Sequence, residues 1–368
     1  MNIFFTKHMI RLFEPYVSSL EKKEVGKVLS SRFWASGSGV GKVAEFEDKF
    51  QRYVKTKKCV AVSNGSAALT LAVSLFNIKN KEVLVPSLTF VSTVNSILEN
   101  GGKPVFVDVN PNDLCMSVSD LREKISKKSS MITPVHFGGI PCDLNEIQKI
   151  AKEYSIPSIE DAAHACGASF NSKKIGSHSD LVCFSFHPVK NLSMPNGGAI
   201  CINHKNSTNF ANQLKSKRWC GIENRKGYNY DVSQLGWNYY MNEISAAIGI
   251  VQLKKLTKLN KIRKKIAKIY HDELKVTKKM PLQNNSSYHL YWICVKNRSD
   301  FMKKMNKSGI ETGIHYNPVH KMTLYKKFKT ALPVTEKISK DIVSLPIHPN
   351  LKENEVNFIV DAVNKYSN

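Results

Sequence analysis

The amino-acid sequence predicts an α/β fold, with a large domain built on a mostly parallel sheet and a smaller C-terminal α+β domain. Between residues 58 and 203, short apolar runs alternate with amphipathic stretches, which is the pattern of strands joined by helices. After about residue 250 this alternation gives way to a long basic helix and mixed elements. The chain has 368 residues, which also favours two domains. We therefore expect a large domain over residues 1–250 and a small domain over residues 251–368.

Seven short apolar runs are the candidate strands of the large sheet. Each is rich in β-branched or aromatic residues and is closed by Gly, Pro, Asn or Asp. Amphipathic stretches such as 67–76 and 144–154 lie between them and predict helices. Ligands bind at the carboxyl ends of parallel strands, so the residues after each run are candidates for a site. The runs are 58–62, 82–86, 103–109, 131–135, 156–161, 181–186 and 198–202.

The C-terminal part begins with a lysine-rich segment, residues 254–279. Apolar residues recur there at three- and four-residue spacing, which predicts one buried face of a helix and a solvated basic face. These residues are Leu253, Leu256, Leu259, Ile262, Ile266, Ile269 and Tyr270. A strand over 288–295, a helix near 299–308 and a closing helix near 353–366 complete the expected small domain.

The chain carries a formal net charge of +24, which raises the question of a nucleic-acid partner. No zinc-finger, basic-zipper or RNP motif accompanies the lysines, so we expect no nucleic-acid partner. The charge is compatible with attraction of an anionic small-molecule substrate.

The sequence also disfavours membrane-spanning, secreted and metal-binding proteins. The sequence contains no uninterrupted run of about 18 apolar residues, so it predicts no membrane span. The N-terminal stretch is interrupted by Lys7 and His8 and does not match a signal peptide, and Met9 is an alternative start. The eight cysteines contain no C-x-x-C pair, which favours reduced thiols without a metal site. We expect a cytoplasmic protein.

The end of the first predicted strand is a candidate phosphate site. Asn64-Gly65 turns the chain, and a helix is expected to begin near Ser66. A helix N-terminus offers unpaired N–H groups and a positive dipole, both of which favour phosphate. An ordinary helix cap is the alternative interpretation. The spacing matches neither the dinucleotide-binding nor the Walker pattern.

A carboxylate and a lysine follow two later strands. Asp161 closes a buried run, where a carboxylate needs a cationic partner such as a protonated pyridine nitrogen, although it could instead only cap a following helix. His164 lies three residues further on, so one helical turn would bring it to the same cleft. Lys190 follows the strand that ends at Ser185, and lysines held in such positions form Schiff bases with carbonyl groups, including that of pyridoxal phosphate.

The motifs in their order resemble the DegT/DnrJ/EryC1/StrS group of sugar aminotransferases, which has the type I (aspartate aminotransferase-like) fold. The resemblance covers nearly the whole chain. The matching segments are the region of Pro15, GVGKVAEFEDKF (39–50), SNGSAALTLAV (63–73), VPSLTFVSTVNSI (85–97), KPVFVDV (103–109), IEDAAHACGA (159–168), FSFHPVKN (184–191), GWNYYMNEISAAIGIVQL (236–253), IHYNPVH (314–320) and SLPIHPNL (344–351). It implies a seven-stranded sheet and the pyridoxal-phosphate-dependent amination of a nucleotide-diphosphate-linked keto sugar, with L-glutamate as donor, in polysaccharide or glycoconjugate synthesis.

The resemblance also implies a role for each matching position. Lys190 would form the Schiff base and carry the proton, and Asp161 would pair with the pyridine nitrogen. Phe90 would stack on the ring, and His164 would lie near the ring and its phenolic oxygen. The phosphate would be held by Gly65, Ser66, Ser185 and, from a neighbouring subunit, Asn238, which implies a homodimer with shared active sites.

Two positions depart from the family pattern, and several alternatives stay open. Tyr240 stands where an arginine is usual, and Asn196 where a glutamate is common, which puts the docking of the donor carboxylate or substrate in question. Related sugar dehydratases carry histidine where this chain has Lys190. A ring ketone such as an inosose is a further possible substrate, and a basic regulatory or nucleic-acid-binding protein could reuse the fold.

Substrate choice is expected to fall to three loops, over residues 31–40, 220–232 and 312–320. His315, Tyr316 and His320 are weaker candidates for the pocket lining, since isolated histidines in loops are more often surface residues.

Overall fold

The computed structural model describes residues 9–367, and the question of the start at Met1 or Met9 concerns residues outside that range. All seven predicted strands are present in the large domain. Two hydrogen-bonded groups of strands are joined through the parallel bridges Ile132–Ser158 and Val135–Asp161, which gives the order β3-β2-β4-β5-β8-β9-β1. The strands are β1 (Lys58–Val62), β2 (Glu82–Pro86), β3 (Lys103–Val107), β4 (Ser129–Ile132), β5 (Ile159–Asp161), β8 (Leu181–Ser185) and β9 (Gly198–Ile202).

The sheet is parallel except for β9, which runs antiparallel to both β8 and β1. The predicted mostly parallel sheet of seven strands is therefore confirmed. Because the other strands share one direction, their carboxyl ends lie along one edge.

Side chains of each strand alternate between two apolar cores. On β8, Leu181 and Cys183 face one core, whereas Val182 and Phe184 face the other. The first core is covered by α3 (Gly65–Val73), α4 (Val91–Glu99) and α7 (Ser207–Lys217). The second is covered by α2 (Lys42–Val54), α5 (Val118–Lys124), α6 (Leu144–Glu153) and α8 (Glu243–Glu273). The parallel strands are buried on both faces, which explains why their sequences are continuously apolar.

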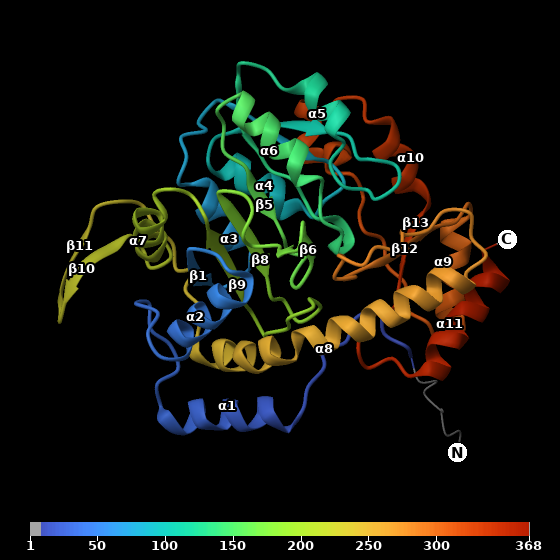
Figure 1. Ribbon diagram of the computed structural model, residues 1–368, viewed down its shortest axis with the longest axis horizontal. Coiled ribbons are helices and arrows are strands. Elements are labelled where there is room, and N and C mark those ends of the chain that lie inside the picture. The colour runs from blue at the N-terminus through green and yellow to red at the C-terminus, as the bar shows by residue number, and fades with distance from the viewer. Residues whose placement is uncertain (1–8, 368) are drawn as a thin grey trace.

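The long helix α8 runs across the lower part of the molecule as drawn in Figure 1, with α1 (Ser19–Ser31) alongside its first half. Its predicted buried face is confirmed at Leu253, Leu256 and Leu259. The helix starts before the lysine-rich segment 254–279 and ends within it. The helix begins at an Asn242 cap, whose side chain accepts from Ser245 N–H, and it ends where the backbone of Leu274 becomes extended.

The C-terminal part contains the antiparallel pair β12 (Tyr291–Cys294) and β13 (Ile342–Leu345). Its helices are α9 (Arg298–Lys307), α10 (Pro333–Asp341) and α11 (Glu353–Tyr366), with short 3-10 turns η2 (Val319–Lys321) and η3 (Thr323–Phe328). The N-terminal segment joins this part, because Ile10 pairs with Ile310. The division at residue 250 stays a prediction, since α8 runs through it without interruption.

Three smaller elements lie outside the large sheet. They are the 3-10 turn η1 (Phe137–Gly139), the strand pair β6 (Ser169–Phe170) and β7 (Lys173–Lys174), and the hairpin β10 (Ile222–Lys226) and β11 (Asn229–Val232). The hairpin replaces the expected loop over 220–232 and projects from the body of the molecule (Figure 1).

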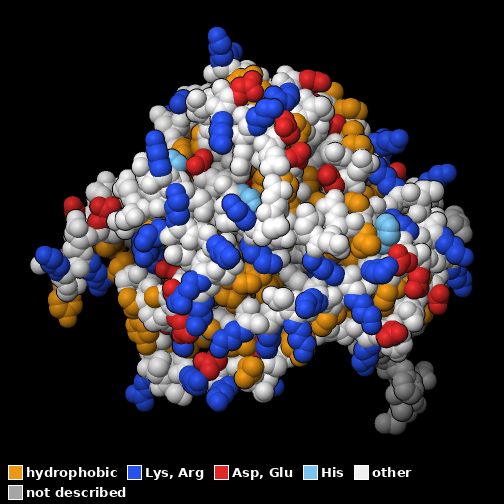
Figure 2. Space-filling view, in the orientation of Figure 1, with side chains coloured by type: hydrophobic (Ala, Val, Ile, Leu, Met, Phe, Trp, Pro, Cys, Tyr) orange, Lys and Arg blue, Asp and Glu red, His pale blue; other side chains and the backbone are white. Residues whose placement is uncertain are grey.

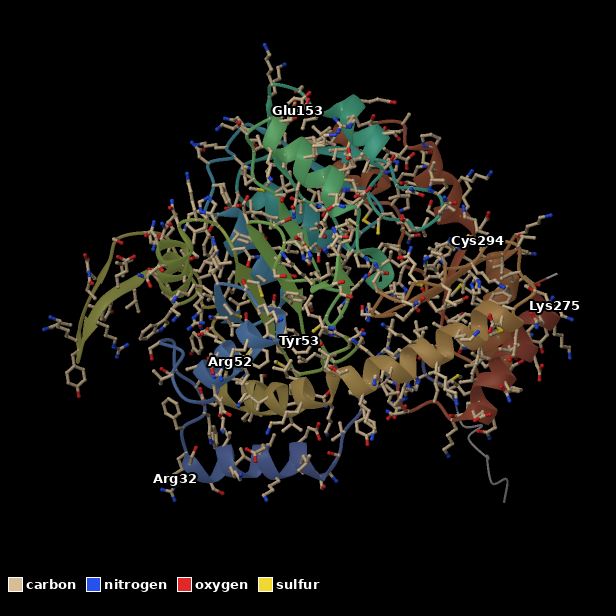
Figure 3. All side chains as sticks on the ribbon, viewed as in Figure 1. Arg32, Arg52, Tyr53, Glu153, Lys275 and Cys294 are labelled. Carbon is tan, nitrogen blue, oxygen red and sulfur yellow. The ribbon has the colours of Figure 1, made fainter. Side chains whose placement is uncertain are left out.

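Lysine and arginine side chains are spread widely over the face shown in Figure 2, with acidic side chains among them. Side chains fill the space between the sheet and α8 (Figure 3). Within residues 9–367, none of the helices combines the length and the apolar character that crossing a bilayer requires.

Asp108, directly after β3, links the sheet to α10. Its buried carboxylate accepts from the backbone N–H groups of Val334 and Thr335, at 2.9 and 2.8 Å, and from the Thr335 hydroxyl at 2.6 Å. The carboxylate thus supplies the N-terminal cap that Leu332 cannot provide.

We expect Asp108→Ala to lower the free energy of unfolding by about 1–3 kcal/mol, because buried N–H donors lose their acceptor. Urea denaturation followed by circular dichroism measures this. Asp272→Ala, which removes only an exposed pair with Lys268, is the control and should change stability by less than about 0.5 kcal/mol. Equal effects of the two substitutions would contradict the capping role.

Candidate active site

A cavity of about 380 Å³ opens at the carboxyl edge of the large sheet. It lies after the ends of β1, β2, β5 and β8, as the strand pattern predicts. All the predicted site residues except Asn238 line it, namely Gly65, Ser66, Phe90, Asp161, His164, Ser185 and Lys190. Asn238 is exposed, and its backbone pairs with Trp219.

The N-terminus of α3 forms one end of the cavity. The side chain of Asn64 accepts from Ala67 N–H at 2.9 Å, so the amides of Gly65 and Ser66 remain available at the positive end of the helix. A Cβ atom on Gly65 would lie 2.6 Å from the Cβ of Ser185, so only glycine fits there. The Ser66 hydroxyl is 2.6 Å from that of Ser92. Amides and hydroxyls of this kind suit a phosphate group.

Asp161 lies at the end of β5 with its carboxylate in the cavity wall. One oxygen accepts from the Thr93 hydroxyl at 2.7 Å, and the other accepts from Ala163 N–H at 3.0 Å. The neighbouring Glu160 points to the opposite face of the sheet, where it contacts His136 and Ser179. Because side chains alternate along the strand, Asp161 and not Glu160 is the carboxylate that faces the cavity.

A turn, rather than the expected helix, follows Asp161, and Ala165 N–H donates to Ala162 C=O within it. The alternative interpretation of Asp161 as a helix cap was therefore wrong. Gly167 ends this turn at a φ of +89°, and a Cβ there would lie 2.4 Å from the amide nitrogen of Asn260. The turn nevertheless brings His164 to the cavity.

His164 is a buried, neutral imidazole. Its Nδ1 accepts from Gly138 N–H at 3.3 Å, so its proton lies on Nε2, which donates to the Tyr316 hydroxyl at 3.0 Å. Burial, together with the positive charge of Lys190, holds the pKa of His164 well below its usual value. The Tyr316 hydroxyl thus keeps its own proton for a further acceptor. Burial raises the pKa of Tyr316, so it stays protonated.

Lys190 follows β8 in a Pro-containing turn, and its half-buried side chain lines the cavity. Burial lowers the pKa of its amine to about 8, although Asp161 acts in the opposite direction. An appreciable fraction of the amine is therefore neutral near physiological pH, and the neutral amine is the nucleophilic form.

The cavity also fits the flat ring of pyridoxal phosphate. Phe90 lines the cavity and is 56% exposed, with its ring centroid 6.1 Å from that of Tyr316. A carboxylate, an amine and a helix N-terminus surround the same space. These groups match the ring nitrogen, the aldehyde and the phosphate of that cofactor.

Comparisons with known proteins agree with this geometry. The DegT/DnrJ/EryC1/StrS aminotransferase family matches residues 15–364. The chain belongs to this family. It is 32% identical to the GDP-perosamine synthase of Vibrio cholerae, covering 98% of this chain and all of that protein.

Two solved sugar aminotransferase structures are also similar to the chain. Helicobacter pylori PseC, described as an aminotransferase of pseudaminic acid biosynthesis, has a TM-score of 0.92 and 26% identity, covering 98% of this chain and 99% of PseC. The PLP-form of the putative sugar aminotransferase Spr1654 from Streptococcus pneumoniae has a TM-score of 0.91 and 25% identity, with the same coverage. The predicted family, the aminotransferase class and the cofactor are thereby confirmed.

Several residues of the aminotransferase's site were not predicted from the sequence. Thr93 contacts Asp161, His289 contacts Lys190, and Phe13 packs edge-on against His315. Of the weaker candidates, His315 and Tyr316 line the cavity. His320 does not, since it is buried beside Ser87 and its Nδ1 lies 2.6 Å from that hydroxyl.

The two departures from the family pattern lie in different places. Asn196 is exposed and lines the cavity, whereas Tyr240 is half-buried and does not. A neutral amide therefore lines the same cavity as Lys190 and Ser185, at the position where a carboxylate is common in the family.

Proposed function

We propose that the enzyme transfers an amino group onto a keto sugar carried by a nucleotide diphosphate, with L-glutamate as donor. The observation that carries this proposal is the opening of the Lys190 amine and the Asp161 carboxylate into one cavity beside the N-terminus of α3. The likeness to the GDP-perosamine synthase of Vibrio cholerae supports a nucleotide-linked sugar as the acceptor. The excess of basic side chains suits such an anionic substrate.

The proposed chemistry assigns one task to each group. When bound, pyridoxal phosphate supplies the electron sink that transamination needs. Lys190 would hold the cofactor covalently, and its amine would take a proton from the donor carbon and return a proton to the sugar carbon. Asp161, whose carboxylate accepts hydrogen bonds from Thr93 and Ala163, would pair with the protonated ring nitrogen.

The remaining groups bind and orient the ligands. The amides of Gly65 and Ser66 and the hydroxyls of Ser66 and Ser185 hold the phosphate. The exposed ring of Phe90 would stack on one face of the pyridine ring, and His164 would lie near the phenolic oxygen. The place of each of these residues in the cavity wall supports its assignment.

We also propose a homodimer in which Asn238 completes the phosphate site of the other subunit. Its exposed position outside the cavity lining supports this arrangement. Apolar residues on and after the β10–β11 hairpin are exposed too, and a second copy would cover them. They are Tyr228, Tyr230, Val232 and Leu235.

We also propose that the protein resides in the cytoplasm, which cell fractionation would test.

The function is tested by offering the purified enzyme a panel of keto sugars linked to GDP, UDP or dTDP, together with L-glutamate. We expect 2-oxoglutarate to be released with at least one nucleotide-linked sugar, because the cavity holds both an amine and a phosphate site. Release with an inosose but with none of the nucleotide-linked sugars would contradict the proposed substrate class. A parallel reaction without acceptor controls for a half-reaction, which consumes no more glutamate than there are enzyme sites.

A further inference from the structure

The amine of Lys190 has one hydrogen-bond contact within residues 9–367, to Nε2 of His289 at 3.4 Å. His289 comes from the C-terminal part of the chain, two residues before β12. Its position relative to Lys190 depends on how the two parts of the chain pack together. No role follows for His289 from the strand pattern in which it occurs.

The His289 ring is held rigidly. It is 1% exposed, and its backbone N–H donates to Gly138 C=O at 2.9 Å. Phe13 stacks on the ring with centroids 5.5 Å apart and an angle of 15° between the planes. The His164 ring is 4.5 Å away, centroid to centroid, at an angle of 39°. A side chain fixed by its neighbours in this way can fix the position of a more flexible partner.

The surroundings of His289 decide its protonation state. The groups that act on it electrostatically are Lys190, His164, Arg263 and His315, all of which are basic. Burial first, and these groups next, hold its pKa well below the usual value, so the ring is neutral. Nδ1 of His289 has no hydrogen-bond partner among the described residues. The neutral tautomer with its proton on Nδ1 presents a lone pair on Nε2 toward the lysine.

We propose that His289 is a positioning residue that accepts a hydrogen bond from the Lys190 amine whenever that amine is not covalently engaged. This inference rests on the proposed function, in which Lys190 alternates between a covalent and a free state. A free lysine has four rotatable side-chain bonds and would otherwise sample many positions. His289 holds the amine at the cavity wall, where it can return a proton to the correct carbon.

The direction of the effect on Lys190 follows from the hydrogen bond. A hydrogen bond accepted by Nε2 of His289 stabilises the ammonium form of Lys190, whereas burial destabilises that form. Removing the acceptor while keeping an apolar ring therefore lowers the pKa of Lys190 further below about 8. Asp161 is the acidic group that acts on Lys190, and it remains in place in such a variant.

The test measures the reactivity of Lys190 in the full-length, cofactor-free protein. Competitive labelling with acetic anhydride from pH 6 to 10, with quantification of the Lys190 peptide by mass spectrometry, reports its titration. His289→Phe keeps the stacking and removes the acceptor, so we expect labelling at pH 7 to rise roughly threefold or more through the larger neutral fraction. His289→Gln retains an acceptor and should restore much of the wild-type profile.

Controls separate a positioning role from a structural one. His348→Gln removes another buried imidazole, which contacts Arg11 C=O rather than Lys190, and should leave the labelling of Lys190 unchanged. In the loaded enzyme, His289→Phe should lower kcat more than it changes KM for the sugar. If His289→Phe does not fold, a wild-type labelling profile in folded His289→Leu overturns the proposal.

An unchanged titration of Lys190 in folded His289→Phe would also overturn the proposal. So would equal effects of His289→Phe and His289→Gln on the labelling of Lys190. The labelling uses neither cofactor nor substrate. Failure of the role proposed for His289 is therefore distinguishable from failure of the proposed sugar aminotransferase function, which the substrate panel tests.

Discussion

Lys190→Ala is expected to abolish transamination, with kcat/KM reduced by about 10⁴-fold or more. The substitution removes both the covalent link to the cofactor and the group that moves the proton, and proton transfer alone contributes about 10²–10⁴-fold. Release of 2-oxoglutarate, measured at saturating glutamate, gives the rate. Borohydride reduction followed by peptide mapping should place the cofactor on Lys190 in the wild type and on no peptide in the variant.

The expected loss belongs to the amine and not to the fold. Lys190 lies in a turn at the cavity wall, so its truncation opens space without breaking the core. Circular dichroism and the urea midpoint should stay close to wild type. Lys217→Ala is the matched control, because Lys217 is also half-buried with a pKa lowered by burial but lies outside the cavity. Full transamination by Lys190→Ala would refute the catalytic role.

The pH dependence of activity provides a check on the same assignment. Because the pKa of Lys190 is lowered to about 8, the neutral amine increases as the pH rises from about 6 to 9. The first covalent step should therefore accelerate over this range in the cofactor-free protein on mixing with pyridoxal phosphate.

Much of the site was predictable because it depends on strand ends. Gly65, Asp161 and Lys190 are far apart in the sequence, but each follows a buried apolar run. Once those runs are strands of a mostly parallel sheet, their carboxyl ends share an edge, and the three residues meet. The buried strand faces could be predicted for a similar reason, since apolar runs closed by turn residues indicate strands buried on both sides.

The residues that were missed contact the site through tertiary packing. Thr93 reaches Asp161 from the helix after β2, and His289 reaches Lys190 from the C-terminal part of the chain. Neither contact has a local sequence signal, because each depends on how separate elements pack. The order of the strands and the antiparallel direction of β9 were likewise not fixed by the periodicity of the runs. The spacing of apolar residues within a segment predicts the conformation of that segment, but it does not predict which other segments pack against it.

Asp161→Asn is the second substitution for which we expect a large effect, a fall in kcat of about 10²–10³-fold. An asparagine can keep contacts with the Thr93 hydroxyl and Ala163 N–H, so the turn should survive. It has no negative charge with which to stabilise a protonated ring nitrogen, and electrostatic stabilisation of this kind supplies several kcal/mol in buried sites. Stopped-flow measurement of each half-reaction should therefore show slow proton removal with glutamate and slow protonation with the sugar.

Comparison with Glu160→Gln decides between a chemical and a structural cause. Both carboxylates are buried on β5, but Glu160 contacts His136 and Ser179 on the other face of the sheet. Its substitution should reduce the urea midpoint while leaving kcat of the folded fraction near wild type. Asp161→Asn should instead lower kcat and leave the urea midpoint near wild type. If Asp161→Asn kept more than about a tenth of the wild-type kcat, the carboxylate would not be needed to hold a charge on the ring nitrogen, and the orientation assigned to the cofactor between Lys190 and α3 would have to be abandoned.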